Sequence, residues 1–168
     1  DFLISVPIFS ELGADQLRRI SLLGSRKFFK KDAWVLHENE TGSALFVIIS
    51  GKVKVSRQSD DGKEVILTIL NEYDFFGEMA ILDGLSRSSG VIAIEETELF
   101  IIQRIDFLNL LQEHPEISVA LLQELTRRLR ASDLRIKALS LRDAEGKVAS
   151  IILQIADDIG TIKQGKVE

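Results

Sequence analysis

The sequence contains no cysteine and only two histidines, His37 and His114. Disulfides, iron–sulfur clusters and thiolate metal sites are therefore excluded for these 168 residues, and so is a centre built from several histidines. No apolar run reaches the roughly 18 residues of a membrane span, and no signal peptide opens the chain. We expect a cytoplasmic protein without a membrane segment, trimmed at Asp1 because the sequence does not begin with methionine.

Motifs for catalysis are also missing. There is no nucleophile elbow, no His-Glu-x-x-His pair and no carboxylate loop for a metal, so the sequence predicts neither an enzyme nor a resident cofactor. The stretch 160–166 imitates a phosphate loop, but Val167 stands where the magnesium-binding hydroxyl belongs. Asn39 begins a glycosylation pattern that a cytoplasmic protein would not use.

Positive charge is scarce in the first two thirds of the chain. Residues 1–111 hold 12 Lys and Arg against 17 Asp and Glu, whereas residues 112–168 hold nine of each. An acidic chain is a poor non-specific binder of nucleic acid. We interpret the six basic residues between Leu125 and Arg142 as a solvated helix face.

Short runs rich in Val, Ile and Phe occupy the middle of the chain, separated by turn signals. Residues 52–56 alternate in polarity, and residues 60–63 form a hairpin turn into the next run. Many short strands with close turns indicate a sandwich or barrel. The expected strands are Leu45–Ile49, Val53–Ser56, Val65–Leu70, Gly90–Ile94 and Leu99–Ile102.

The two ends of the chain have helical periodicity. One or two short amphipathic helices are expected in the first thirty residues, and another at Ile105–Leu111, ending near His114–Pro115. The helix that follows has an apolar seam with spacings of three and four, which favours a coiled coil between two protomers over a helix packed on its own domain. The seam residues are Leu122, Leu125, Leu129, Ser132, Ile136 and Leu139.

A break at Arg142–Asp143 precedes a further amphipathic helix, which Gly160 should end. Its apolar positions are Val148, Ile151, Ile152, Ile155 and Ile159. A short polar tail then reaches Glu168. Because little remains to cover the apolar face, we expect this to be the start of a second domain.

The segment Phe75–Ser89 has the composition of an anion site. Gly77 lets the backbone approach a ligand, and the turn of helix after it would offer free N–H groups to a phosphate. Arg87 offers a planar fork, with Ser88 as a hydroxyl donor beside it, and Glu78 could accept from a sugar hydroxyl. A loop stabilised by a Glu78–Arg87 ion pair fits the composition equally well.

This segment resembles the phosphate-binding cassette of cyclic-nucleotide-binding domains, and the C-terminal part resembles the CRP/FNR family of bacterial transcription regulators. Residues 125–132 resemble the family's dimer helix, and residues 143–149 resemble the opening of its winged-helix DNA-binding domain. The resemblance implies an α+β fold, with an antiparallel β jelly roll flanked by short helices and followed by a long dimerisation helix. It implies a sensor domain at 1–112, the dimerisation helix at 113–141, and the start of a truncated DNA-binding domain at 142–168.

The resemblance also implies roles for individual residues. Arg87 and Ser88 would bind the cyclic phosphate, Glu78 would hold the ribose hydroxyl, and Ser132 with Asp133 would touch the purine across the dimer interface. The residues so assigned are Gly77, Glu78, Met79, Ala80, Arg87, Ser88, Ser89, Ser132 and Asp133. Cyclic AMP is the favoured effector and cyclic GMP the second candidate.

The sequence departs from the family pattern at three positions. Asn39 and Tyr73 stand in turns where the family usually has glycine, and Asp133 is acidic where cyclic-AMP sensors carry a small hydroxyl residue. An acidic side chain there can accept a hydrogen bond from an exocyclic amine of the base.

The predicted function is a ligand-sensing transcription regulator that forms a homodimer. DNA and RNA polymerase would be partners of the full-length protein only, since the recognition helix is expected beyond Glu168. The alternative is a cyclic-nucleotide regulatory module of a kinase, channel or transporter. A cupin-like jelly-roll enzyme would need clustered histidines, which are absent. Relatives that sense gases or organic acids remain a further alternative, against which the Arg87–Ser88 pair favours a nucleotide.

Overall fold

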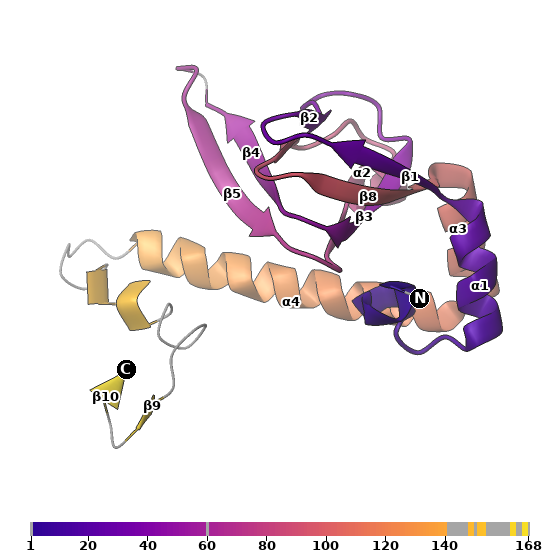
Figure 1. Cartoon of the computed structure of the whole chain (residues 1–168). Coiled ribbons are helices and arrows are strands. Elements are labelled where there is room, and N and C mark those ends of the chain that lie inside the picture. Colours follow the sequence, from indigo (N-terminus) through magenta and orange to yellow (C-terminus); the bar gives the residue numbers. More distant parts are fainter. Residues whose placement is uncertain are drawn as a thin grey trace. The chain divides into compact units, whose positions relative to one another are not determined.

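The computed structural model describes residues 2–59, 61–140, 148–149, 151–153, 162–163 and 166–167. The chain forms two compact units, residues 1–122 and 123–168. Helix α4 (Pro115–Ser140) begins in the first unit and continues into the second. Figure 1 shows the order of the elements along the chain.

The first unit contains a jelly roll of two four-stranded antiparallel sheets. One sheet has the order β1-β8-β3-β6 and the other β2-β7-β4-β5. The strands are β1 (Ser25–Phe29), β2 (Trp34–Leu36), β3 (Ala44–Ser50), β4 (Val53–Gln58), β5 (Glu64–Leu70), β6 (Phe75–Phe76), β7 (Gly90–Ala93) and β8 (Thr97–Gln103).

The core is assembled from one face of each sheet. Alternate residues of β3 point inward, and every other strand except β1 contributes at least one buried apolar side chain. Alternation follows from the two-residue period of a strand, and burying each such side chain contributes about 1.5–3 kcal/mol. The rings of Phe46 and Phe76 stack with their centroids 5.1 Å apart. The core residues are Leu36, Ala44, Phe46, Ile48, Val53, Leu70, Phe76, Val91 and Leu99.

Short helices flank the jelly roll. Two 3-10 helices (Phe2–Ser5 and Pro7–Phe9) lead into α1 (Ala14–Leu23), and α3 (Arg104–Glu113) follows the last strand of the sandwich. Gln16 of α1 reaches the junction of α3 and α4, where its amide lies 3.2 Å from His114 Nδ1 and 3.4 Å from the Glu116 carboxylate. These contacts give His114 a structural role at the junction of the helices.

The second unit is described only in part. After α4, residues 148–149 and 151–153 are helical, and two short antiparallel strands follow, β9 (Ile162–Lys163) and β10 (Lys166–Val167). The polar tail expected there thus contains strand structure. The predicted break at Arg142–Asp143, the positions Ile155 and Ile159, and the stop at Gly160 lie outside the described residues.

The α+β jelly-roll prediction is confirmed. All five expected strands are present, with Gly90–Ile94 one residue shorter than expected, and a single α-helix forms in the first thirty residues. The strands β1, β2 and β6 were not assigned individually from the sequence. In the part of the chain that the structure describes, no helix is long and apolar enough to cross a membrane.

Candidate functional site

The segment Phe75–Ser89 forms a strand, one short helix and a returning loop. Strand β6 delivers the chain to Gly77, whose φ of +88° turns it into α2 (Glu78–Asp83). Gly84, with a φ of +72°, ends the helix. Both ends of α2 therefore use the left-handed conformation that glycine adopts at little cost.

Gly77 also leaves the space in which Arg87 lies. A Cβ at position 77 would stand 2.7 Å from Arg87 Nη1 and 3.0 Å from the carbonyl oxygen of Ala44. The first separation is shorter than Cβ atoms tolerate and the second is tight, so a larger residue would have to displace the guanidinium. The conformation and the space at position 77 both require glycine.

Arg87 lies beneath this segment with only 4% of its surface exposed. Its Nη1 donates to the Gly77 carbonyl at 2.6 Å, and its Nη2 donates to the Ala44 carbonyl at 2.8 Å. The guanidinium carbon lies 5.7 Å from the centre of the Phe46 ring. The buried Nε has no hydrogen-bond partner, which is unusual because such a donor costs about 1–3 kcal/mol.

Two carboxylates lie close enough to Arg87 to affect its charge. Burial lowers the pKa of the Arg87 guanidinium, and the negative charges of Glu78 and Glu40 act in the opposite direction. Glu78 is as buried as Arg87, at 4% exposure. The negative charge of Glu78 acts on Arg87, the residue that the ion-pair interpretation of the sequence had named as its partner. The arrangement is a buried, fixed cation beside a buried carboxylate, and the Nε of the cation has no hydrogen-bond partner.

A second segment, residues 39–42, packs against the site. The backbone N–H of Asn39 donates to the Arg87 carbonyl at 2.9 Å, and the N–H of Arg87 donates to the Glu40 carbonyl at 2.8 Å. Gly42 packs so closely on Ala80 that no Cβ fits between them. Asn39 has a φ of +68°, so it takes the left-handed conformation that glycine usually provides in the family.

The remaining predicted residues of the segment differ in their exposure. Met79 is exposed, Ala80 is buried, Ser88 is exposed and Ser89 is half-buried. The Ser88 hydroxyl donates to the Met79 sulfur at 4.0 Å. The fold thus brings together seven of the predicted residues, namely Gly77, Glu78, Met79, Ala80, Arg87, Ser88 and Ser89.

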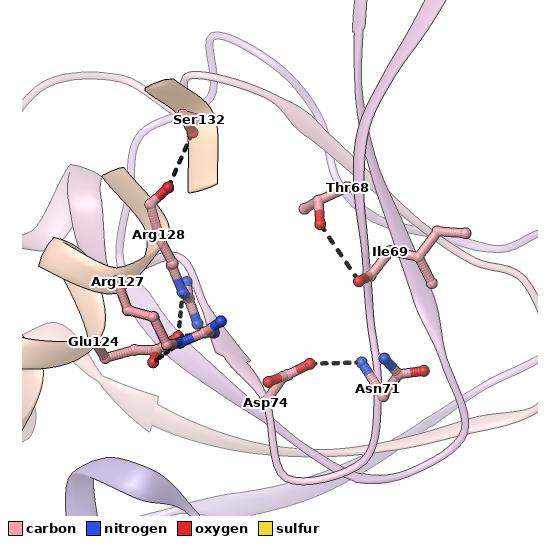
Figure 2. Close-up of polar contacts among 8 residues, drawn as sticks. All are labelled: Thr68, Ile69, Asn71, Asp74, Glu124, Arg127, Arg128 and Ser132. Carbon is pink, nitrogen blue, oxygen red and sulfur yellow. Dashed lines mark hydrogen bonds and ion pairs between the residues drawn. The ribbon is translucent and has the colours of Figure 1, made fainter. Parts of the chain in front are cut away.

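Ser132 and Asp133 belong to the second unit, on the exposed surface of α4. The Ser132 hydroxyl donates to the backbone carbonyl of Arg128 at 3.0 Å, as Figure 2 shows. This is the backbone partner that a serine on a helix finds without a ligand. Their assignment as base contacts stays a prediction.

Sequence reasoning missed the residues that hold Arg87 from outside its own segment. Ala44 accepts through its carbonyl, Phe46 supplies a ring face, and Glu40 supplies charge. A backbone carbonyl 43 positions away has no sequence signature. The sequence signal that was available is Asn39, which stands where the family pattern has glycine and so indicated an unusual backbone conformation in the 39–42 turn.

These groups can bind an anion but are not arranged for a metal. Among the residues that the structure describes, no three His, Cys, Asp or Glu side chains gather where they could hold a metal ion. A guanidinium fixed by two carbonyls keeps its planar donor edge in place, and planar forks of this kind match phosphate geometry.

Comparisons with known proteins identify the family and the fold of this chain. Residues 26–114 match the cyclic nucleotide-binding domain family. The chain is 39% identical over 137 residues to a "CRP-like cAMP-activated global transcriptional regulator" of Mycobacterium tuberculosis, covering 82% of this chain and 61% of that protein. It is 32% identical over 149 residues to a "Cyclic AMP receptor protein" of Thermus thermophilus, covering 89% of this chain and 69% of that protein.

A solved structure shares the fold. The catabolite activator protein of Thermus thermophilus aligns with a TM-score of 0.73 at 25% identity, over 96% of this chain and 92% of that chain. The chain spans about 61% of the length of the Mycobacterium relative. The sequence match, the shared jelly roll and the long helix after it show that this chain belongs to the CRP/FNR family of transcription regulators.

Proposed function

We propose that this chain is the sensor part of a transcription regulator that binds a cyclic nucleotide, cyclic AMP in the first instance, between α2 and Arg87. The cyclic phosphate would accept from Arg87 and Ser88, and the ribose hydroxyl would donate to Glu78. A pair of α4 helices would carry the signal to a helix-turn-helix DNA-binding domain, which with RNA polymerase would take part only in the full-length protein.

The observation that supports this most strongly is the state of Arg87. A guanidinium at 4% exposure has lost most of its hydration, and its Nε has no partner. Burying a charge is costly unless an opposite charge and further hydrogen bonds offset it. A phosphate anion that accepts from Nε would supply both, whereas a purely structural arginine would be expected to use that donor.

Calorimetry of the chain with cyclic AMP and cyclic GMP, titrated in parallel, tests the ligand. Arg87→Leu should weaken binding by about 30-fold or more, the effect of truncating one partner of a buried charged hydrogen bond. Arg87→Lys should also weaken it, because an ammonium keeps the charge and loses the planar fork. Far-ultraviolet circular dichroism of each variant checks that the jelly roll is intact.

Arg104→Leu is the matched control. Arg104 also donates to a backbone carbonyl of α2, that of Ile81 at 3.3 Å, but its side chain is exposed and bound to the last turn of the helix. Its loss should leave the affinity for cyclic AMP unchanged. Native affinity in Arg87→Leu, or an equal loss in Arg104→Leu, would contradict the assignment of the phosphate to Arg87.

The preference for cyclic AMP rests on Ser132 and Asp133. In a dimer built along the α4 seam, the two side chains of one protomer would meet the base bound to the other. The Asp133 carboxylate would accept from the 6-amino group of adenine and repel the 6-carbonyl oxygen of guanine. Ser132→Ala should lower affinity modestly and weaken the coupling to DNA, read as cyclic AMP and operator affinity in the full-length protein. Unchanged affinity and coupling would show that this serine does not read the base.

A further inference from the structure

Met79 is the only sulfur-containing residue in the 168-residue sequence, which holds one methionine and no cysteine. It is the second residue of α2, between the buried Glu78 and the buried Ala80. Its own side chain is 53% exposed. Reactive oxygen species that reach the chain therefore meet one thioether, and it lies inside the candidate ligand site.

The sulfur of Met79 is in contact with a predicted ligand-binding group. The Ser88 hydroxyl donates to it at 4.0 Å. A thioether is a weak acceptor, so this bond holds the hydroxyl loosely and a phosphate oxygen could displace it. The Met79 side chain is thus exposed, and its sulfur contacts the donor that follows Arg87 in the chain.

We propose that Met79 is a modification site at which a hydroperoxide reduces binding of the cyclic nucleotide; this rests on the proposed function. A sulfur lone pair attacks one peroxide oxygen, the O–O bond breaks and an S–O bond forms. The sulfur loses two electrons and becomes a sulfoxide, and hydrogen peroxide is reduced to water. Methionine sulfoxide is reversible by reductases, so the site can return to its first state.

Two physical effects predict that oxidation of Met79 lowers the affinity for the cyclic nucleotide. The sulfoxide oxygen is a much stronger acceptor than the thioether, so it holds the Ser88 hydroxyl that the phosphate would otherwise receive. The same oxygen carries partial negative charge, which is unfavourable close to an anionic ligand. Loss of one hydrogen bond from a hydroxyl to a charged phosphate corresponds to about tenfold to 100-fold in affinity.

The test treats the chain with hydrogen peroxide, follows oxidation of Met79 and of Trp34 by peptide mass spectrometry, and titrates cyclic AMP by calorimetry. Affinity should fall by about tenfold to 100-fold once Met79 is oxidised and Trp34 is not, and methionine sulfoxide reductase should restore it. In Met79→Leu, whatever its own affinity, peroxide should change nothing. Met79→Gln places an amide oxygen near Ser88 and should bind more weakly than Met79→Leu.

Several results would overturn the inference. These are native affinity after complete oxidation of Met79, an equal loss in peroxide-treated Met79→Leu, and resistance of Met79 to peroxide that oxidises free methionine. Failure of the untreated chain to bind either cyclic nucleotide would overturn the proposed function as well, so the two failures are distinguishable.

Discussion

Gly77 and Gly84 form a matched pair of positions at the two ends of α2. Both have positive φ, +88° and +72°, so alanine is strained at each. They differ in their surroundings: a Cβ at Gly84 would meet nothing within 4 Å, whereas a Cβ at Gly77 would meet Arg87, Ala44 and Phe46. Comparing Gly77→Ala with Gly84→Ala therefore separates backbone strain from the steric cost at the site.

The expected magnitudes follow from these contacts. Alanine in the left-handed region costs about 1–2 kcal/mol, from which the lower entropy of its unfolded chain recovers part. Gly84→Ala should therefore lower the free energy of unfolding by about 1 kcal/mol. Gly77→Ala adds displacement of the Arg87 guanidinium and loss of its 2.6 Å bond to the Gly77 carbonyl, about 1.5–3 kcal/mol for a charged donor. Its total should be about 3 kcal/mol.

Urea unfolding followed by fluorescence gives both free energies, since the one tryptophan, Trp34, lies on β2 in the same unit. Cyclic AMP affinity should fall in Gly77→Ala and stay near native in Gly84→Ala, because only the first moves Arg87. Equal destabilisation of the two variants within about 0.5 kcal/mol, near the error of such comparisons, would refute the claim that Gly77 makes room for the arginine.

Three further predictions concern the turn before β6 and helix α4. Tyr73 has a φ of +68°, a conformation that glycine adopts without strain and valine does not. Urea unfolding should therefore show that Tyr73→Gly raises the free energy of unfolding by up to about 1 kcal/mol and that Tyr73→Val lowers it. Hydrogen bonds from Arg127, and less strongly from Arg128, hold the pKa of Glu124 below its ordinary value despite burial (Figure 2). That stabilisation is complete above about pH 4.5 and is lost as pH falls through the lowered pKa. Glu124→Gln should therefore reduce helix content, measured by circular dichroism, at about pH 7, and its difference from the wild type should shrink as the pH is lowered below about 4.5. Leu129→Glu should give monomers in sedimentation, because Leu129 lies in the apolar seam with 62% of its surface exposed. Leu134→Glu is the control: Leu134 is 59% exposed but lies outside the seam, so this variant should stay dimeric. A monomeric wild type at micromolar concentration would contradict the dimer.

The long strands and the helices could be predicted because their signals are local. Residues 45–49, 53–56 and 65–70 carry the β-branched and alternating patterns of strands, and α3 and α4 carry helical spacing. The binding segment was equally local, since Gly77, Glu78 and Arg87 lie within eleven consecutive residues. These features depend on neighbours in the chain, which the sequence displays directly.

The strands without a clear pattern were decided by tertiary structure. Strand β1 reads Ser-Arg-Lys-Phe-Phe, and β6 has only two residues, so neither offers the alternation of a half-buried strand. Both form because β8 and β3 present free backbone edges to them. An unpaired backbone group near a core is costly, so pairing overrides weak local preference.

The state of Arg87 was likewise invisible in the sequence, which left an anion site and a structural ion pair equally open. The fold brings the Ala44 carbonyl, 43 positions away, to the guanidinium. It also holds Asn39 and Tyr73 in left-handed conformations, which asparagine adopts readily and tyrosine does not. Burial of the arginine and the lack of a partner for its Nε arise from segments that meet only in the folded chain. The sequence by itself determined which residues could bind an anion, and the packing of distant segments decided how the arginine among them is held.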